Sequence, residues 1–269
     1  MTAVVEETGP AAPGTGPATA PAKAPGKARQ RPPIGLFGIP IFVAVLMGGW
    51  LIWRLSADLS DVDLRTLGWS VLGSMTWRHL QLTVVGTVLV LIVSIPLGIA
   101  LTRPHLRRFS GPVTAFANGG QAAPSIGLLV LLAMWLGFGF WTAILGLAIY
   151  AILPVLRNTI TGLNGVDPTL IEAGRGMGMS GPAVLLRIEI PLAIPVIMSG
   201  VRTALVLLVG TASLATFIGA GGLGQLITTG VNLFRNPILI TGSLLIAALA
   251  LLIDWFGRVL EYVVRPKGM

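Results

Sequence analysis

The sequence predicts an all-α integral membrane protein with about six transmembrane helices. Of its 269 residues, 54% are apolar and only 10% are charged, whereas a soluble domain has about 25% charged residues. Apolar stretches long enough to cross a bilayer recur along the chain. Because the bilayer core has no water to bond open backbone groups, such stretches have to be helical. This composition argues against a soluble enzyme and a nucleic-acid-binding protein. The basic residues behind the net charge of +8 are expected in cytoplasmic loops, facing anionic lipid headgroups.

The N-terminal region combines a polar tail with a first apolar stretch. Residues 1–33 contain seven of the 19 prolines and no aromatic residue, so we expect a disordered cytoplasmic tail. The tail ends in basic residues, and the apolar stretch Ile34–Trp53 follows directly. This stretch exceeds the usual 7–15 apolar residues of a secretory signal. Its length therefore favours an uncleaved anchor helix over a signal peptide. We expect residues 34–77 to consist of this transmembrane helix and an outer loop.

Five further stretches are predicted to span the membrane. They are Leu80–Leu101, Thr114–Leu136, Phe140–Leu156, Pro191–Leu214 and Ile238–Tyr262. Thr114–Leu136 is the weakest of them, because Asn118, Gly119, Gly120, Gln121 and Pro124 interrupt its first half.

The distribution of basic residues supports six spans. With a cytoplasmic N-terminus, 13 of the 18 Lys and Arg residues fall on the cytoplasmic side and four fall outside. Cytoplasmic loops of membrane proteins are enriched in Lys and Arg. We therefore expect both termini in the cytoplasm, with residues 263–269 as a short C-terminal tail.

Several kinds of site are excluded by missing residue types. The chain has no Cys and two His, which argues against a metal site. Its lysines are Lys23, Lys27 and Lys267, so no Gly-rich turn ends in the Lys that a P-loop needs. We expect no cofactor on this chain and no catalytic residue. If ATP is used, ATP and Mg belong to a partner.

The polar segment 157–190, between the fourth and fifth predicted spans, contains the most specific pattern. Asp167-Pro168 is typical of a helix N-cap followed by a first-turn proline. A short helix through Glu172 is expected to break at the glycines Gly174, Gly176 and Gly178. A second helix is expected from Ser180 to Ile190, and Pro191 begins the next span. A helix–turn–helix on the cytoplasmic side indicates a docking surface.

The spacing of this segment resembles the EAA loop of ABC-type import permeases. That loop has Glu-Ala-Ala or Glu-Ala-Gly, three residues, Gly, nine residues, Ile, one residue, an aliphatic residue and Pro. Here those places are filled by Glu172, Ala173, Gly174, Gly178, Ile188, Ile190 and Pro191. The flanking segments resemble permeases of osmoprotectant importers, over residues 78–262. The resemblance implies a type I importer permease core of five helices, to which the N-terminal helix is an addition.

The resemblance also implies function and partners. The chain would form the translocation path for glycine betaine, choline or carnitine, pairing with a second permease copy or a sister permease. Two ATPase subunits and an extracytoplasmic substrate-binding protein would complete the importer in the bacterial inner membrane. The loop around Glu172 would insert into a cleft of the ATPase. The residues expected to couple are Asp167, Glu172, Ala173, Gly174, Arg175, Gly176, Gly178, Ile188 and Pro191.

Other polar or glycine positions within the spans are candidates for the path or for gating. Ionisable groups in spans usually face the protein interior, so Arg202 is expected to pair with Asp254, as a structural link or as a gate. Asn118, Gln121 and Ser125 either line the path or hold helices together. Gly221 and Gly222 let a non-helical backbone line a cavity.

Three alternatives to an osmoprotectant importer remain open from the sequence. The same importer class with another zwitterionic or amino-acid-like solute would look similar, because the binding protein selects the solute first. An ion-coupled secondary transporter would show inverted repeats and ionisable groups near mid-membrane, and only Arg202 lies deep. A non-transporting scaffold would leave the loop's spacing unexplained.

Overall fold

The computed structural model describes residues 35–264, all of whose regular elements are helices. The membrane helices are α1 (Gly35–Ser56), α3 (Trp69–Thr102), α4 (Ser110–Ala122), α5 (Ser125–Leu136), α6 (Phe140–Asn164), α9 (Ile190–Ala212) and α11 (Asn236–Val264). Between them lie α2 (Asp61–Thr66), η1 (Arg107–Phe109), α7 (Pro168–Gly176), α8 (Gly181–Val184), η2 (Leu185–Glu189), η3 (Ser213–Ile218) and α10 (Gly224–Asn232). The expected tail at residues 1–33 and residues 265–269 lie outside the described part.

The all-α fold class is confirmed, and the number of spans depends on one broken segment. Five helices are long and apolar enough to cross a membrane, or six if the bent pair of α4 and α5 counts as one span. The two helices bend by 96° at the break. Ala123 has extended backbone dihedrals there, as expected for the residue before Pro124. The stretch predicted at Thr114–Leu136 is therefore two half-length helices.

The other predicted spans are present, and most are longer than expected. α3 begins 11 residues before the predicted Leu80, and α6 continues through Asn164, so residues 157–164 are helical. At about 1.5 Å per residue, the 34 residues of α3 exceed the roughly 30 Å of a hydrocarbon core. The domain boundary expected at residue 78 falls inside α3, and α11 extends two residues beyond 262.

Helix α6 forms the centre of the bundle. It packs against α3, α9, α4 and α5, and 61% of its most apolar stretch is buried, against 11% for α1. Small residues allow this close approach, as is typical of membrane helices. A Cβ on Gly200 of α9 would lie 2.7 Å from the Pro154 carbonyl oxygen of α6.

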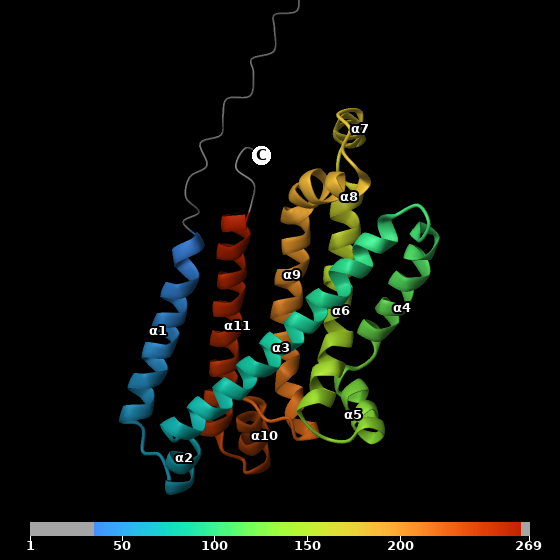
Figure 1. Ribbon diagram of the computed structural model, residues 1–269. Coiled ribbons are helices and arrows are strands. Elements are labelled where there is room, and N and C mark those ends of the chain that lie inside the picture. Colours follow the sequence, from blue (N-terminus) through green and yellow to red (C-terminus); the bar gives the residue numbers. More distant parts are fainter. Residues whose placement is uncertain (1–34, 265–269) are drawn as a thin grey trace, which may run out of the picture. The chain divides into compact units, whose positions relative to one another are not determined.

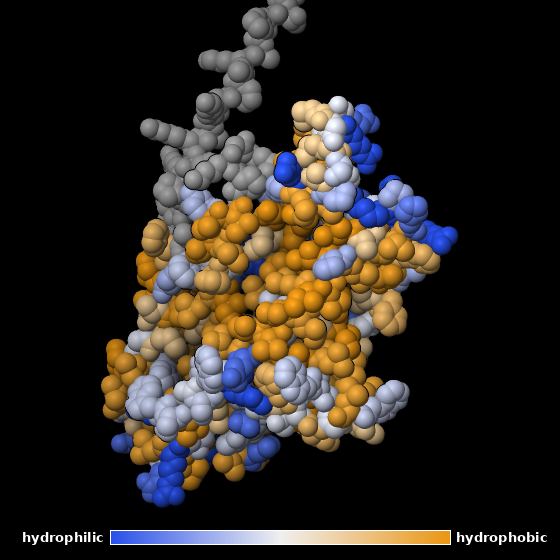
Figure 2. Space-filling view, in the orientation of Figure 1, coloured by the Kyte–Doolittle hydropathy of each residue, from blue (hydrophilic) through white to orange (hydrophobic). Residues whose placement is uncertain are grey.

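The two ends of the bundle differ from its middle. α7 projects at one end, while α2 and α10 lie at the other (Figure 1). Hydrophobic residues cover the middle of the face in Figure 2, and hydrophilic residues gather around α7 and at the opposite end. This banding is what a bilayer-spanning chain requires.

Candidate functional site

The predicted docking helix is α7, and it begins at the predicted cap. The Asp167 carboxylate accepts hydrogen bonds from the Thr169 hydroxyl (2.7 Å) and the Thr169 backbone N–H (2.9 Å). These bonds, first the hydroxyl and then the backbone one, hold the pKa of Asp167 below its usual range. Pro168 takes the first helical position, where its missing N–H costs no hydrogen bond.

The end of α7 is set by one glycine, not three. Gly178 has φ +83°, a left-handed conformation that favours glycine. Its N–H donates to the Arg175 carbonyl (2.9 Å), and the Met179 N–H donates to the Gly174 carbonyl (3.1 Å). This is the Schellman arrangement of a helix C-terminus. The expectation that Gly174 and Gly176 also break the helix was wrong, because both have ordinary helical geometry inside α7.

The two faces of α7 have different surroundings. Gly174 is buried, and a Cβ there would lie 2.6 Å from Ile188 Cδ1. Two positions of the EAA pattern thus contact each other within the chain. The remaining coupling candidates on and after α7 are exposed: Glu172, Ala173, Arg175, Gly176 and Gly178. Leu170 and Met177 are also exposed, at 46% and 76%, so the exposed surface of α7 is mixed apolar and charged.

A π-helical turn, η2 (Leu185–Glu189), connects this element to α9. The Ile190 N–H donates to the Leu185 carbonyl, five residues back. Pro191 follows at the start of α9. In a regular α-helix, a Pro has no N–H to donate and its ring clashes with the carbonyl four residues earlier. A wider π turn directly before Pro191 is consistent with this constraint. The segment from Ser180 to Ile190, predicted as a separate helix, is therefore continuous with α9.

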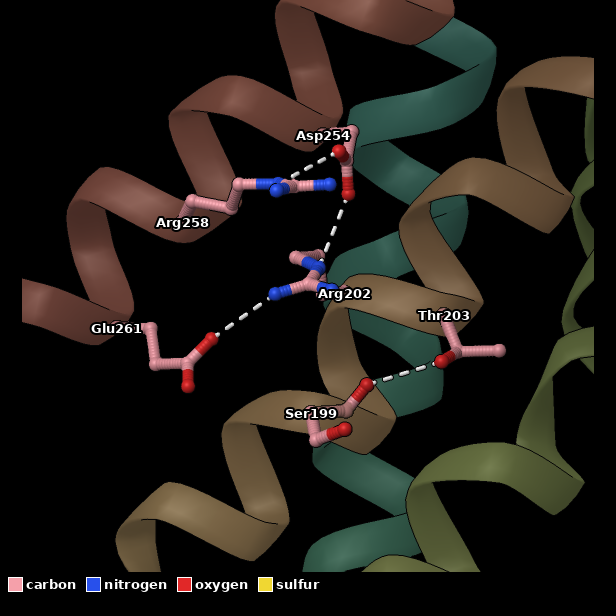
Figure 3. A network of polar contacts seen from close by, with 6 residues as sticks. All are labelled: Ser199, Arg202, Thr203, Asp254, Arg258 and Glu261. Atoms are coloured by element: carbon pink, nitrogen blue, oxygen red, sulfur yellow. Dashed lines mark hydrogen bonds and ion pairs between the residues drawn. The ribbon is translucent and has the colours of Figure 1, made fainter. Parts of the chain in front are cut away.

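Arg202 forms the expected pair with Asp254, and the pair belongs to a larger network (Figure 3). Arg202 Nε lies 3.0 Å from Asp254 Oδ1, and Arg202 Nη1 lies 3.2 Å from Glu261 Oε2. Arg258 Nε lies 2.9 Å from Asp254 Oδ2. Two cations and two carboxylates thus balance between α9 and α11, which lowers the cost of placing charge in a span.

The polar residues around the broken segment come from its two halves. Asn118 and Gln121 lie three residues apart in α4, hence on one face, and Ser125 begins α5. All three are half-buried. Within residues 35–264, none of the three makes a side-chain hydrogen bond. Their role in the path stays a prediction.

The glycine segment after α9 lies against α3. Gly221 and Gly222 have φ +84° and +95°, and a Cβ on either would come within 3.2 Å of Arg78 or His79 respectively. Arg78 Nε donates to the Ala220 carbonyl (3.0 Å). A neighbouring cavity of about 300 Å³ is lined by Thr216, Phe217, Ile227, Thr228, Val231 and Asn232, so the two glycines do not line it.

Several contacting residues were not singled out from the sequence. Glu189 is buried beside Arg103, whose Nη1 donates to Glu189 Oε1 (3.2 Å). Glu261 and Arg258 complete the Arg202 network. The sequence did contain a signal for these residues: a carboxylate among apolar residues needs a polar partner when it is buried. Over residues 35–264, no group of three His, Asp or Glu residues is arranged to hold a metal ion.

Comparison with known proteins gives a consistent result. Residues 94–265 match the family model described as "Binding-protein-dependent transport system inner membrane component". The chain is 44% identical over 194 residues to the glycine betaine/carnitine/choline transport system permease protein OpuCB of Bacillus subtilis (strain 168). That match covers 72% of this chain and 88% of the relative. It is 39% identical over 203 residues to the osmoprotectant import permease protein OsmW of Salmonella typhimurium, covering 74% and 94%.

A solved structure has the same fold. It is an inward-facing conformation of the MetNI methionine ABC transporter, with a TM-score of 0.67 and 25% sequence identity. The match covers 77% of this chain and the whole of the matched chain.

Proposed function

Because the chain belongs to the family of binding-protein-dependent transport system inner membrane components, we propose that it forms the translocation path of an ABC importer for an osmoprotectant. Glycine betaine, choline and carnitine are the solutes proposed, because the relative OpuCB is a glycine betaine/carnitine/choline permease and the relative OsmW is an osmoprotectant import permease. Family membership makes the chain a transport permease. It leaves the ion-coupled transporter and the scaffold without support.

The observation that carries the proposal is the geometry of α7. A capped short helix projects from one end of a membrane bundle, exposes Glu172 and Arg175, and fixes its buried face on Ile188. A helix held on one face and open on the other suits insertion into a partner's cleft. The coupling role of Asp167, Glu172, Ala173, Gly174, Arg175, Gly176, Gly178, Ile188 and Pro191 is part of the proposal.

The remaining assembly follows from this role. Two ATPase subunits bind at the α7 ends of two permeases, which are two copies of this chain or this chain and a sister. ATP and Mg are bound by the ATPase, in keeping with the lack of Lys between residues 28 and 266. The α7 end and both termini face the cytoplasm of a bacterial cell, and a substrate-binding protein docks at the α10 end.

The structure suggests roles for the other candidates. The Arg202–Asp254 network fixes α11 against α9. Asn118, Gln121 and Ser125, beside the break between α4 and α5, leave polar groups without partners within the described residues and are proposed to line the path. Gly221 and Gly222 shape its outer end.

A second candidate is an amino-acid-like zwitterion. The matched solved structure is of a methionine transporter, and an ammonium–carboxylate solute shares its charges with carnitine and glycine betaine. The two candidates differ in whether the cationic group is a quaternary ammonium.

Reconstitution in vesicles tests the function. The chain, its ATPase subunit and its binding protein are combined with internal ATP, and uptake of labelled glycine betaine, choline, carnitine and methionine is measured. Uptake is expected for at least one quaternary ammonium solute, and only when ATPase, ATP and binding protein are all present. Uptake that persists without the ATPase, or that follows an ion gradient, would overturn the proposal.

A further inference from the structure

The joint between η2 and α9 is held by two contacts from opposite directions. On one side, Ile188 packs against Gly174 of α7, where no side chain intervenes. On the other, the next residue, Glu189, faces Arg103 at the end of α3. The same turn therefore contacts the docking helix and a membrane helix 86 residues earlier in the chain.

The contact between Glu189 and Arg103 is bidentate. Arg103 Nη1 donates to Glu189 Oε1 (3.2 Å), and Nη2 donates to Oε2. Paired guanidinium–carboxylate bonds fix orientation as well as distance. The Glu189 side chain is only 7% exposed, and Arg103 is 34% exposed. A pair with a buried carboxylate loses much more when one partner is removed than an exposed ion pair does.

The position of the pair makes it a mechanical connection. Arg103 directly follows α3, whose helix ends before Pro104. Glu189 closes the π turn that leads into α9. π turns inside helices are frequent at functional sites. A displacement of α7 would therefore reach α9 through the backbone and α3 through this ion pair.

We infer that Glu189 and Arg103 are positioning residues for coupling, which hold α3 and α9 together so that both move with α7. The inference rests on the proposed function, because it assigns how movement at the ATPase reaches the membrane helices. Neither residue contacts the transported solute in this role. Without the pair, α7 still docks on the ATPase but moves α9 without α3.

The test uses the complete transporter in vesicles, with Glu189→Gln as the main variant because it keeps the side chain's shape. Arg103→Lys keeps the charge but removes the bidentate geometry. The charge exchange Arg103→Glu with Glu189→Arg restores an ion pair. Arg187→Gln is the matched control, since Arg187 lies in the same turn and is exposed. Solute imported per ATP hydrolysed is measured together with the amount of ATPase that co-purifies.

Glu189→Gln is expected to lower solute imported per ATP by about two- to thirtyfold, the range for changes within a coupling network. ATPase co-purification should stay at the native level. Arg103→Lys should be intermediate, Arg187→Gln should be unchanged, and the exchange should recover at least part of the loss.

Normal import per ATP in Glu189→Gln would overturn the inference, as would a charge exchange that is no better than its single changes. A loss of ATPase binding equal to the loss of import would also overturn it, because the pair would then act on docking. If the native transporter imports without its ATPase, the proposed function itself fails, so the two failures are distinguishable.

Discussion

The two ends of α9 are both held by α3, but by different kinds of contact. At the α7 end, the bond joins two side chains, Arg103 and Glu189. At the α10 end, α3 side chains reach backbone groups: Arg78 Nε donates to the Ala220 carbonyl, and His79 Nε2 lies 3.0 Å from the Val209 carbonyl oxygen. Glycines make the second contact possible by leaving room for these side chains.

The difference indicates which end is built to move. At the α7 end, one ion pair at a π turn restrains the orientation of α9 relative to α3. At the α10 end, backbone also lies directly against backbone: a Cβ on Gly230 of α10 would lie 2.5 Å from the Leu239 backbone N of α11. We therefore interpret the α7 end as the lever and the α10 end as a fixed support. Substitutions at the support are expected to affect folding, and substitutions at the lever are expected to affect coupling.

The largest effect is expected from Gly224→Ala at the α10 end. A Cβ on Gly224 would lie 1.9 Å from the Ser213 carbonyl oxygen, a backbone atom that cannot rotate away. We expect a loss of about 1–3 kcal/mol or more in stability, seen as a lower melting temperature in detergent. Gly210→Ala in α9 is the control, because nothing lies within 4 Å of its added Cβ. Equal melting temperatures for the two variants would contradict a rigid α10 end.

Gly178→Val should produce the next largest effect, on coupling at the α7 end. Val in the left-handed conformation costs about 1–2 kcal/mol, so transport is expected to fall about five- to thirtyfold. Asn tolerates this conformation far better, and Gly178→Asn should stay close to native transport. Gly181→Ala is the exposed control, because nothing lies within 4 Å of its added Cβ. If Asn is as harmful as Val, close approach of the ATPase, and not backbone conformation, requires glycine here.

The contrast between the two ends also explains what the sequence could and could not predict. Local signals worked: Asp167-Pro168 marks the start of α7, and Pro124 marks the break between α4 and α5. The start of α3 was missed because Arg78 and His79 look too polar for a span. Their partners lie 142 and 130 residues away.

The same limit applies to the candidate site. The EAA spacing identifies α7 and Ile188, but nothing local to Glu189 indicates Arg103, 86 residues earlier. Contacts across helices depend on packing that a single sequence does not specify. Gly174 shows a related limit: the sequence predicted a helix break there, whereas its lack of a Cβ leaves room for Ile188 of the same chain.

A smaller effect is expected from the Arg202 network, which lies between the two ends of α9. Arg202→Met keeps the stem that packs on Gly257, and Asp254→Asn keeps the shape of the carboxylate. Each single change leaves other partners in place, Glu261 or Arg258, so each loss is partly compensated. A double-mutant cycle on thermal stability should therefore give an interaction near the lower end of the range for contacting residues, about 0.5 kcal/mol. Strictly additive changes would remove the link between α9 and α11.

The smallest effect is expected at Asp167, the exposed cap of α7. Asp167→Ala removes the acceptor for the Thr169 N–H, so the first turn of α7 should fray and transport should fall less than in Gly178→Val. Asp167→Asn keeps an acceptor and is the matched control.

The Asp167 pKa is lowered in the folded chain. The contribution of Asp167 to the stability of α7 is therefore present above the unfolded pKa and is lost as pH falls through the folded pKa. Asp167→Ala should thus differ from native by the same ratio at pH 6 and pH 8. A ratio that changes between these pH values would show that another titrating group controls the cap.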